Sequence, residues 1–145
     1  MRRSAPLALL AATAVAALSI ATPAMAGGRS FDTDLSGANE VPGPGDDDGE
    51  GTAQITINRG QGEICYSIQV SDVETILAGH IHKAGVDAFG PVVVPLFNGA
   101  ITDGTAEGCV DVSRASAKDI SKNPSDYYVN VHNAEFPGGA LRGQL

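Results

Sequence analysis

Short segments in which hydrophobic and polar residues alternate make up most of the chain, and glycine or proline separates them. Residues 51–58 place Ala53, Ile55 and Ile57 at every second position, and residues 63–71 repeat this pattern. Because successive side chains of a β-strand point to opposite faces, a period of two predicts two strands that each bury one face. The glycine-containing turn between them predicts a β-hairpin.

The same pattern predicts strands along the rest of the chain. They cover residues 31–40, 77–83, 92–97, 106–112, 127–132 and 140–145. Pro95 places its strand at a sheet edge or a bulge, because proline cannot donate to a strand ladder. A turn is expected at Asn98-Gly99.

Residues 113–122 are the one helical candidate. Ser113 can cap the N-terminus, Ala115 and Ala117 favour a helix, and Asn123-Pro124 ends it. Many short strands with one helix before the penultimate strand predict an all-β domain. We expect an antiparallel, immunoglobulin-like sandwich or barrel, similar in outline to superoxide dismutase.

The N-terminus has the layout of an export signal. Arg2 and Arg3 precede an apolar run over about residues 7–21, and Ala24 and Ala26 form an A-x-A site. This layout predicts a signal peptide, residues 1–26, that is cleaved near Ala26. The alternative is an uncleaved N-terminal anchor, although the run is shorter than the ~20 residues that a membrane helix needs.

Cleavage would leave one secreted, extracellular domain, residues 27–145. Without Arg2 and Arg3, the nine basic residues become seven against seventeen acidic ones, a formal net charge of −10. This charge repels nucleic acid and anionic lipid, which excludes both as partners, and no later segment could span a membrane. Asp46-Asp47-Asp48 is expected to be a solvated hairpin tip, because calcium loops space their carboxylates at alternate positions.

Cys65 and Cys109 are the two cysteines of the chain. In an oxidising compartment, an even pair in a small domain predicts one disulfide. The bond would close a loop of about 45 residues and contribute roughly 3–4 kcal/mol. A cysteine ligand or nucleophile is the alternative. No nucleophile motif or phosphate-binding loop is present, so we expect no catalytic residue and no organic cofactor.

Histidines are concentrated in two strand segments. In Gly79-His-Ile-His-Lys83, the side chains of His80 and His82 share one face of a strand, roughly 6–7 Å apart. Two imidazoles at that separation can reach one metal ion. Ile81 points the opposite way, towards the core, and this places both histidines on the outer face.

His132 also lies on the outer face of its predicted strand. Val129 and Val131 face the core, whereas Tyr128, Asn130 and His132 face outwards. If the two strands are neighbours, His80, His82 and His132 form a three-nitrogen site suited to copper or zinc, with a position left for a further ligand. The alternative is that the histidines serve as hydrogen-bonding struts.

Other polar residues are candidates for supporting roles. Asn130 and Tyr128 flank the site; Asn130 could orient His132, although a cross-strand amide hydrogen bond is favoured. Arg142 could lie near the histidines, but a surface ion pair with a carboxylate such as Glu135 is the favoured interpretation.

Four motifs in order resemble the CHRD domain, a family named from chordin and also found in secreted microbial proteins. They are Ala78–His82, Gly90–Leu96, Tyr127–His132 and Gly139–Gln144. The segments around Cys65 and Cys109 also look like the family's cysteine positions. The resemblance implies an immunoglobulin-like β-barrel and export. Two departures are His132-Asn133 for His-Thr and Gly139-Ala140 for Gly-Glu, so no role of that glutamate transfers to this chain.

These observations predict an extracellular binding module with a three-histidine surface site for one copper or zinc ion, in a structural or partner-binding role. The partner would be another extracellular protein or a second copy of the chain. One alternative is a mononuclear copper redox enzyme of superoxide-dismutase type; three histidines are too few for the two-metal dismutase site. The other is a metal-free structural or adhesive domain.

Overall fold

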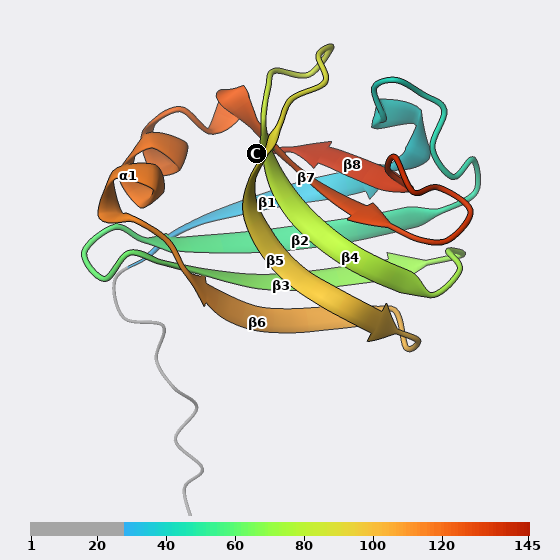
Figure 1. The fold of residues 1–145 in the computed structure, drawn as a ribbon, viewed down its shortest axis with the longest axis horizontal. Helices are drawn as coiled ribbons and strands as arrows, with labels where there is room; N and C mark the ends of the chain where they lie inside the picture. The colour runs from blue at the N-terminus through green and yellow to red at the C-terminus, as the bar shows by residue number, and fades with distance from the viewer. Residues whose placement is uncertain (1–27) are drawn as a thin grey trace, which may run out of the picture.

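Eight antiparallel strands form one continuous sheet in the computed structural model, which describes residues 28–145 (Figure 1). The strands are β1 (Arg29–Ser36), β2 (Glu50–Asn58), β3 (Glu63–Ser71), β4 (Ile76–Lys83), β5 (Val92–Ile101), β6 (Thr105–Asp111), β7 (Tyr127–His132) and β8 (Leu141–Gln144). Their order in the sheet is β5-β4-β7-β8-β1-β2-β3-β6. The sheet curls almost into a barrel, so the predicted all-β fold is confirmed. The predicted signal peptide, residues 1–26, lies outside the described residues.

Two of the predicted boundaries are wrong. The first strand ends at Ser36, and Gly37–Asn39 forms a 3-10 helix, η1, in place of the expected continuation to Glu40. β5 runs through the expected Asn98-Gly99 turn to Ile101. Irregularities in its pairing with β4 accommodate these two residues within the strand, and the chain turns instead around Gly104, whose φ of 72° suits glycine. As Pro95 predicted, β5 is an edge strand with an irregular register.

The helix α1 (Arg114–Lys122) confirms the helical prediction. Its buried face includes Ala117 and Ile120, which join the core. A second 3-10 helix, η2 (Pro124–Asp126), leads into β7. Among residues 28–145, no helix has the length and apolar character needed to cross a bilayer.

Ser113 caps α1, since its Oγ accepts a hydrogen bond of 3.0 Å from the Ser116 backbone N–H. We expect Ser113→Ala to lower the free energy of unfolding by about 1 kcal/mol, because it leaves a helix N–H without its partner. Ser113→Asp keeps an acceptor and should stay close to wild type. Urea unfolding followed by circular dichroism measures both variants, and equal loss in both would contradict the cap.

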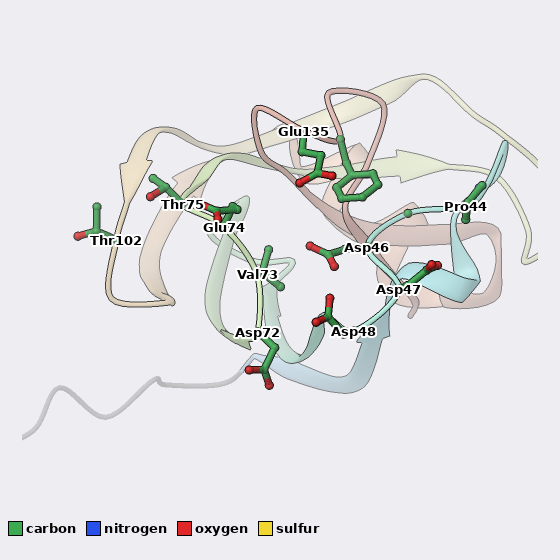
Figure 2. Close-up of a pocket in the computed structure, with 12 residues that line it drawn as sticks. Pro44, Asp46, Asp47, Asp48, Asp72, Val73, Glu74, Thr75, Thr102 and Glu135 are labelled. Carbon is green, nitrogen blue, oxygen red and sulfur yellow. The ribbon is translucent and has the colours of Figure 1, made fainter.

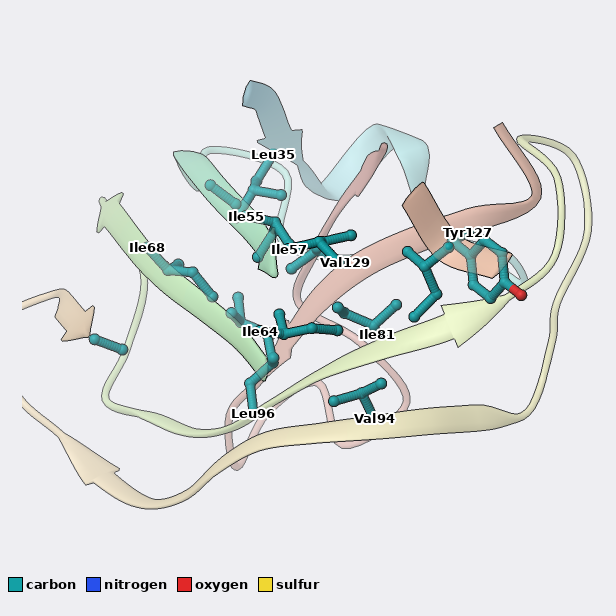
Figure 3. Packing of buried hydrophobic residues seen from close by; sticks show 14 of the residues in the cluster. Leu35, Ile55, Ile57, Ile64, Ile68, Ile81, Val94, Leu96, Tyr127 and Val129 are labelled. Carbon is teal, nitrogen blue, oxygen red and sulfur yellow. The ribbon is translucent and has the colours of Figure 1, made fainter. Parts of the chain in front are cut away.

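The interior of the curled sheet is filled by one hydrophobic cluster, which is mostly aliphatic (Figure 3). Ile55 and Ile57 of β2 face Ile81 of β4 and Val129 of β7 within it, and all are almost fully buried. These inward residues carry the period-two pattern of the sequence. Their alternation fixes the phase of β4 and β7 and therefore the face on which the histidines lie.

The outer face of β7 is also covered, which the alternation does not indicate. Tyr127 to Val131 are all buried, whichever way they point. Part of the covering is the β4–β5 loop, residues 84–91, which projects from one end of the sheet in Figure 1 and whose Gly90 backbone N–H donates to the Tyr128 hydroxyl. Side chains of β8 bind this loop: Gln144 donates to Ala84 O, and Arg142 donates to Gly85 O. A buried polar layer therefore lies outside the sheet at β4, β7 and β8.

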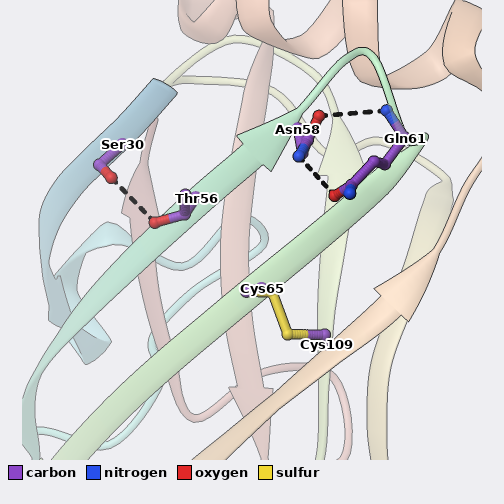
Figure 4. Close-up of a disulfide and its surroundings, with 6 residues drawn as sticks. All are labelled: Ser30, Thr56, Asn58, Gln61, Cys65 and Cys109. Atoms are coloured by element: carbon purple, nitrogen blue, oxygen red, sulfur yellow. Dashed lines mark hydrogen bonds between the residues drawn. A yellow bond between two sulfur atoms is a disulfide. The ribbon is translucent and has the colours of Figure 1, made fainter. Parts of the chain in front are cut away.

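Cys65 and Cys109 form the predicted disulfide (Figure 4). The two residues are direct partners in the pairing of β3 with β6. Since β6 is an edge strand whose one neighbour in the sheet is β3, the bond fixes that edge covalently.

Candidate metal centre

Strand pairing brings all three histidines together. β4 and β7 are antiparallel neighbours, with His80 opposite Asn130 and His82 opposite Tyr128. His132 is opposite Ala78, two residues before His80. Because His80, His82 and His132 share one strand phase and the strands are adjacent, their side chains rise from the same outer face.

The three side chains converge. One ring nitrogen from each of His80, His82 and His132 lies within 4.8 Å of the others. His80 Nδ1 and His132 Nε2 are 3.0 Å apart. Two bonds of about 2.1 Å to one ion span at most about 4.2 Å, so this pair is within reach of a single ion, and any separation near the 4.8 Å limit closes with a small side-chain shift. The group could therefore hold a metal.

The site is less exposed than the sequence predicts. His82 is only 4% exposed, whereas His80 and His132 are partly exposed. The prediction of a surface position is wrong for His82, because the β4–β5 loop folds over it. The Nδ1 of His82 donates to Gly90 O at 2.8 Å, and its ring stacks on Tyr128 with centroids 4.7 Å apart.

Backbone carbonyls determine which ring nitrogens carry protons. A carbonyl oxygen only accepts, so the Nδ1 of His82 donates to Gly90 O and the Nδ1 of His132 donates to Pro137 O, 3.1 Å away. In a neutral imidazole, this leaves a lone pair on each Nε2. Histidine ligands of metal ions are typically held in this way, with the other ring N–H bonded to a carbonyl or carboxylate.

Burial keeps the imidazoles of His80 and His132 neutral. It lowers the pKa of His80 to about 4, with smaller contributions from the neighbouring His132 and His82. Burial also lowers the pKa of His132, although the hydrogen bond to Pro137 opposes this. At neutral pH both rings are therefore in the unprotonated form that binds metal ions.

The side chain of Asn130 contacts the histidine cluster, in addition to lying on a strand next to β4. It is 1% exposed, and its Oδ1 is 3.0 Å from His132 Nε2. The favoured prediction of a cross-strand amide bond missed this contact with His132, because Asn130 and His132 are two residues apart on one strand and their side chains rise together.

Arg142 is buried, and the predicted surface ion pair is wrong. Its guanidinium lies 3.5 Å from the centre of the Tyr128 ring and donates to Gly85 O at 2.8 Å. Only 1% of Arg142 is exposed. A cation on an aromatic face is stabilised by the ring quadrupole, so Tyr128 links Arg142 to His82 through two ring contacts.

The sequence analysis missed Glu40, which is buried beside this layer and 7% exposed. Burial raises the pKa of Glu40 to about 7, while Arg142, a hydrogen bond from Asn130 and the Val41 backbone lower it. The sequence pattern predicted only that Glu40 ends the first strand. No local pattern marks its burial, which depends on packing against Gly139, far along the chain.

Glu40 gives the metal-free domain a pH-dependent stability. Its pKa is about 7 in the folded protein, against 4.5 for an unperturbed glutamate, so the folded protein holds the proton more tightly. The contribution of Glu40 to stability is therefore fully present below pH 4.5 and is lost as pH rises through 7, by on the order of 3 kcal/mol. The lowered pKa of His80 acts in the opposite direction, so the effect of Glu40 is read from the difference between wild type and a Glu40 variant. We expect Glu40→Gln to remove this loss. Urea unfolding of both proteins at pH 5 and pH 8 measures it, and identical pH slopes would contradict it.

The aspartate loop is not a solvated hairpin tip throughout. Asp46 is buried, and its backbone N–H donates to Ala140 O at 2.9 Å. The loop lines an open groove of about 780 Å³, in which Asp46 and Asp48 lie close together while Asp47 lies apart (Figure 2). Burial and the adjacent Asp48 raise the pKa of Asp46. The prediction of exposed carboxylates holds for Asp47 and Asp48 and is wrong for Asp46.

Comparison with known proteins identifies the family. Residues 31–145 match the CHRD domain, and this span contains the histidine motifs, both cysteines and all the covering loops. Neither the curated proteins nor the solved structures gave a match. The match covers nearly the whole described region, and the chain belongs to the CHRD domain family.

Proposed function

We propose that this CHRD domain is an extracellular binding module that holds one copper or zinc ion through His80, His82 and His132. One observation carries the proposal. The Nε2 of His82 is buried and has no hydrogen-bond partner. A buried polar atom without a partner is unfavourable by about 1–3 kcal/mol, and a metal ion bound by the three nitrogens would satisfy it.

The donor set supports these two metals. Three imidazole nitrogens suit zinc and copper, whereas calcium and magnesium prefer oxygen ligands. Carbonyls of Gly90 and Pro137 hold two of the rings, so little side-chain freedom would be lost on binding. The sheet already pairs β4 with β7 along its length, so the ion would add to a formed site rather than create one.

Export of the domain belongs to the same proposal. The A-x-A signal ending near Ala26 predicts secretion, and the Cys65–Cys109 disulfide fits an oxidising compartment. The ion would have a structural role or would bind a partner, either an extracellular protein or a second copy of the chain. His80 and His132 are partly exposed, which supports access of a partner group to the ion.

A mononuclear copper redox enzyme is the second candidate. The same partial exposure of His80 and His132 would admit a small substrate such as superoxide. Superoxide turnover by the copper-loaded domain, compared with His80→Ala, distinguishes this candidate from a binding module. Turnover no faster than that of the variant would exclude the enzyme and leave the module.

Metal titration tests the proposal. The domain of residues 27–145, with its disulfide intact, is titrated calorimetrically with Cu(II), Cu(I) and Zn(II) at pH 7. We expect one ion per chain with micromolar or tighter affinity for at least one of them. Absence of stoichiometric binding for all three would contradict the metal site and favour hydrogen-bonding struts.

A further inference from the structure

We propose that Asn130 Oδ1 is the fourth ligand of the ion, and that the resulting three-nitrogen, one-oxygen set favours Cu(II). This inference rests on the proposed three-histidine site and deepens it. The structure supplies three supporting observations: the position of Asn130, the pairing of two acceptor atoms, and the separations of the donor atoms.

Asn130 is the fourth side chain of the histidine cluster. It lies directly opposite His80 in the pairing of β4 with β7, and two residues before His132 on β7. His82 is two residues beyond His80 on β4, so the four side chains come from two adjacent strands on one face. With 1% exposure, the Asn130 side chain is directed into the buried layer rather than into solvent.

Two acceptor atoms, His132 Nε2 and Asn130 Oδ1, lie next to each other in this cluster. Because His132 Nδ1 donates to Pro137 O, a neutral His132 has a lone pair on Nε2. The Asn130 Oδ1 lies 3.0 Å from that nitrogen and also carries only lone pairs. In the metal-free protein, His80 Nδ1 lies 3.0 Å from the same Nε2 and its N–H donates to it. A cation in place of this proton would be within reach of His132 Nε2 and Asn130 Oδ1 together, with His80 carrying its proton on the other ring nitrogen.

The amide oxygen of Asn130 is the atom that faces the histidines. It is Oδ1 that lies 3.0 Å from His132 Nε2. An amide oxygen carries lone pairs and can bind a cation directly, whereas an amide NH₂ group only donates.

For side chains that keep their metal-free positions, the separations fit a tetragonal ion. His132 Nε2 is 3.0 Å from His80 Nδ1 and 3.0 Å from Asn130 Oδ1. With bonds of about 2.0–2.1 Å, atoms 3.0 Å apart subtend roughly 90–97° at the ion, whereas a tetrahedral angle needs about 3.3–3.4 Å. Angles near 90° with nitrogen and oxygen ligands are typical of Cu(II), while zinc in such sites is tetrahedral.

Electron paramagnetic resonance of the Cu(II)-loaded domain tests the inference. We expect a tetragonal spectrum without the broadening that an equatorial water enriched in oxygen-17 causes, because Asn130 fills the fourth equatorial position. Asn130→Leu should still bind one Cu(II) through the histidines, with oxygen-17 broadening from a water ligand. Because this water replaces the amide oxygen, we expect the affinity to fall by only about 10–100-fold, the range for loss of a supporting group. Asn130→Asp retains an oxygen ligand and should keep an unbroadened spectrum. Asn98→Leu, the same substitution at an exposed position on β5, is the control and should match wild type.

The outcomes separate the two proposals. If Asn130→Leu binds Cu(II) with wild-type affinity and spectrum, Asn130 is not a ligand, and the three-histidine site stands. If the wild-type domain binds no copper or zinc, the proposed function itself fails. Should Asn130→Leu not fold, the wild-type spectrum decides, since clear oxygen-17 broadening there assigns the position to water and overturns the role of Asn130.

Discussion

His82→Ala is expected to weaken metal binding by more than 100-fold. His82 supplies the most buried of the three ring nitrogens, and the hydrogen bond to Gly90 O holds that ring in position. Loss of a supporting group outside the ligand set typically weakens binding roughly 10–100-fold, so loss of a ligand should exceed that range. Calorimetric titration of the variant with Cu(II) and Zn(II) measures the effect.

Lys83→Ala is the matched control for this prediction. Lys83 follows His82 on the same strand, but its side chain is exposed and pairs with Asp119. The control should bind metal like wild type. His82→Ala also removes a stacked ring from beneath the β4–β5 loop, so circular dichroism must first show a folded variant. Affinities in His82→Ala within threefold of wild type would contradict the ligand role of His82.

Loss of the Cys65–Cys109 disulfide is expected to destabilise the domain by about 3–4 kcal/mol. The bond joins residues separated by 44 positions, and restricting the unfolded chain over such a loop accounts for that amount in the chain-entropy model. The effect should be marked because β6 is an edge strand paired with β3 alone. Urea unfolding of the metal-free domain, with and without reductant, measures the loss.

The double variant Cys65→Ala/Cys109→Ala controls for the reductant. It should have the stability of the reduced wild type and show no further change when reductant is added. A loss below about 1 kcal/mol on reduction would mean that the unfolded chain gains little freedom, contrary to the entropic account. Because the comparison uses metal-free protein, it does not depend on the histidine site.

The core and the phase of the histidines could be predicted from the sequence. Ile55, Ile57 and Ile81 lie on the buried face that alternation assigned to them. Alternation also placed His80, His82 and His132 on the opposite face, and the pairing of β4 with β7 confirms that they meet. Alternation works here because a strand has only two faces and the core fixes one of them.

Burial on the outer face could not be predicted in the same way. His82, Arg142 and Glu40 are covered by loops that are distant in sequence or irregular in structure, and no periodic pattern describes such contacts. The sequence contained one signal of this burial. The run Tyr127–Val131 contains four bulky residues around Asn130 and does not alternate cleanly, which is typical of a strand buried on both faces.

The ends of two strands could also not be predicted from the local sequence pattern. Asn98-Gly99 has the composition of a turn, yet β5 continues past it because pairing with β4 absorbs the irregularity. Likewise, the segment from Gly37 leaves the sheet because the backbone of Asp46 packs against it, leaving no room for a side chain at Gly37. Both outcomes depend on tertiary contacts rather than on residue preference.

Anomalous diffraction from crystals of the copper-soaked domain tests the central claim most directly. Data collected on both sides of the copper absorption edge locate the ion without reference to any variant. We expect one anomalous peak per chain, about 2.0–2.2 Å from a ring nitrogen of each of His80, His82 and His132. A peak elsewhere, for example at the Asp46–Asp48 loop, with none among the histidines, would contradict the account.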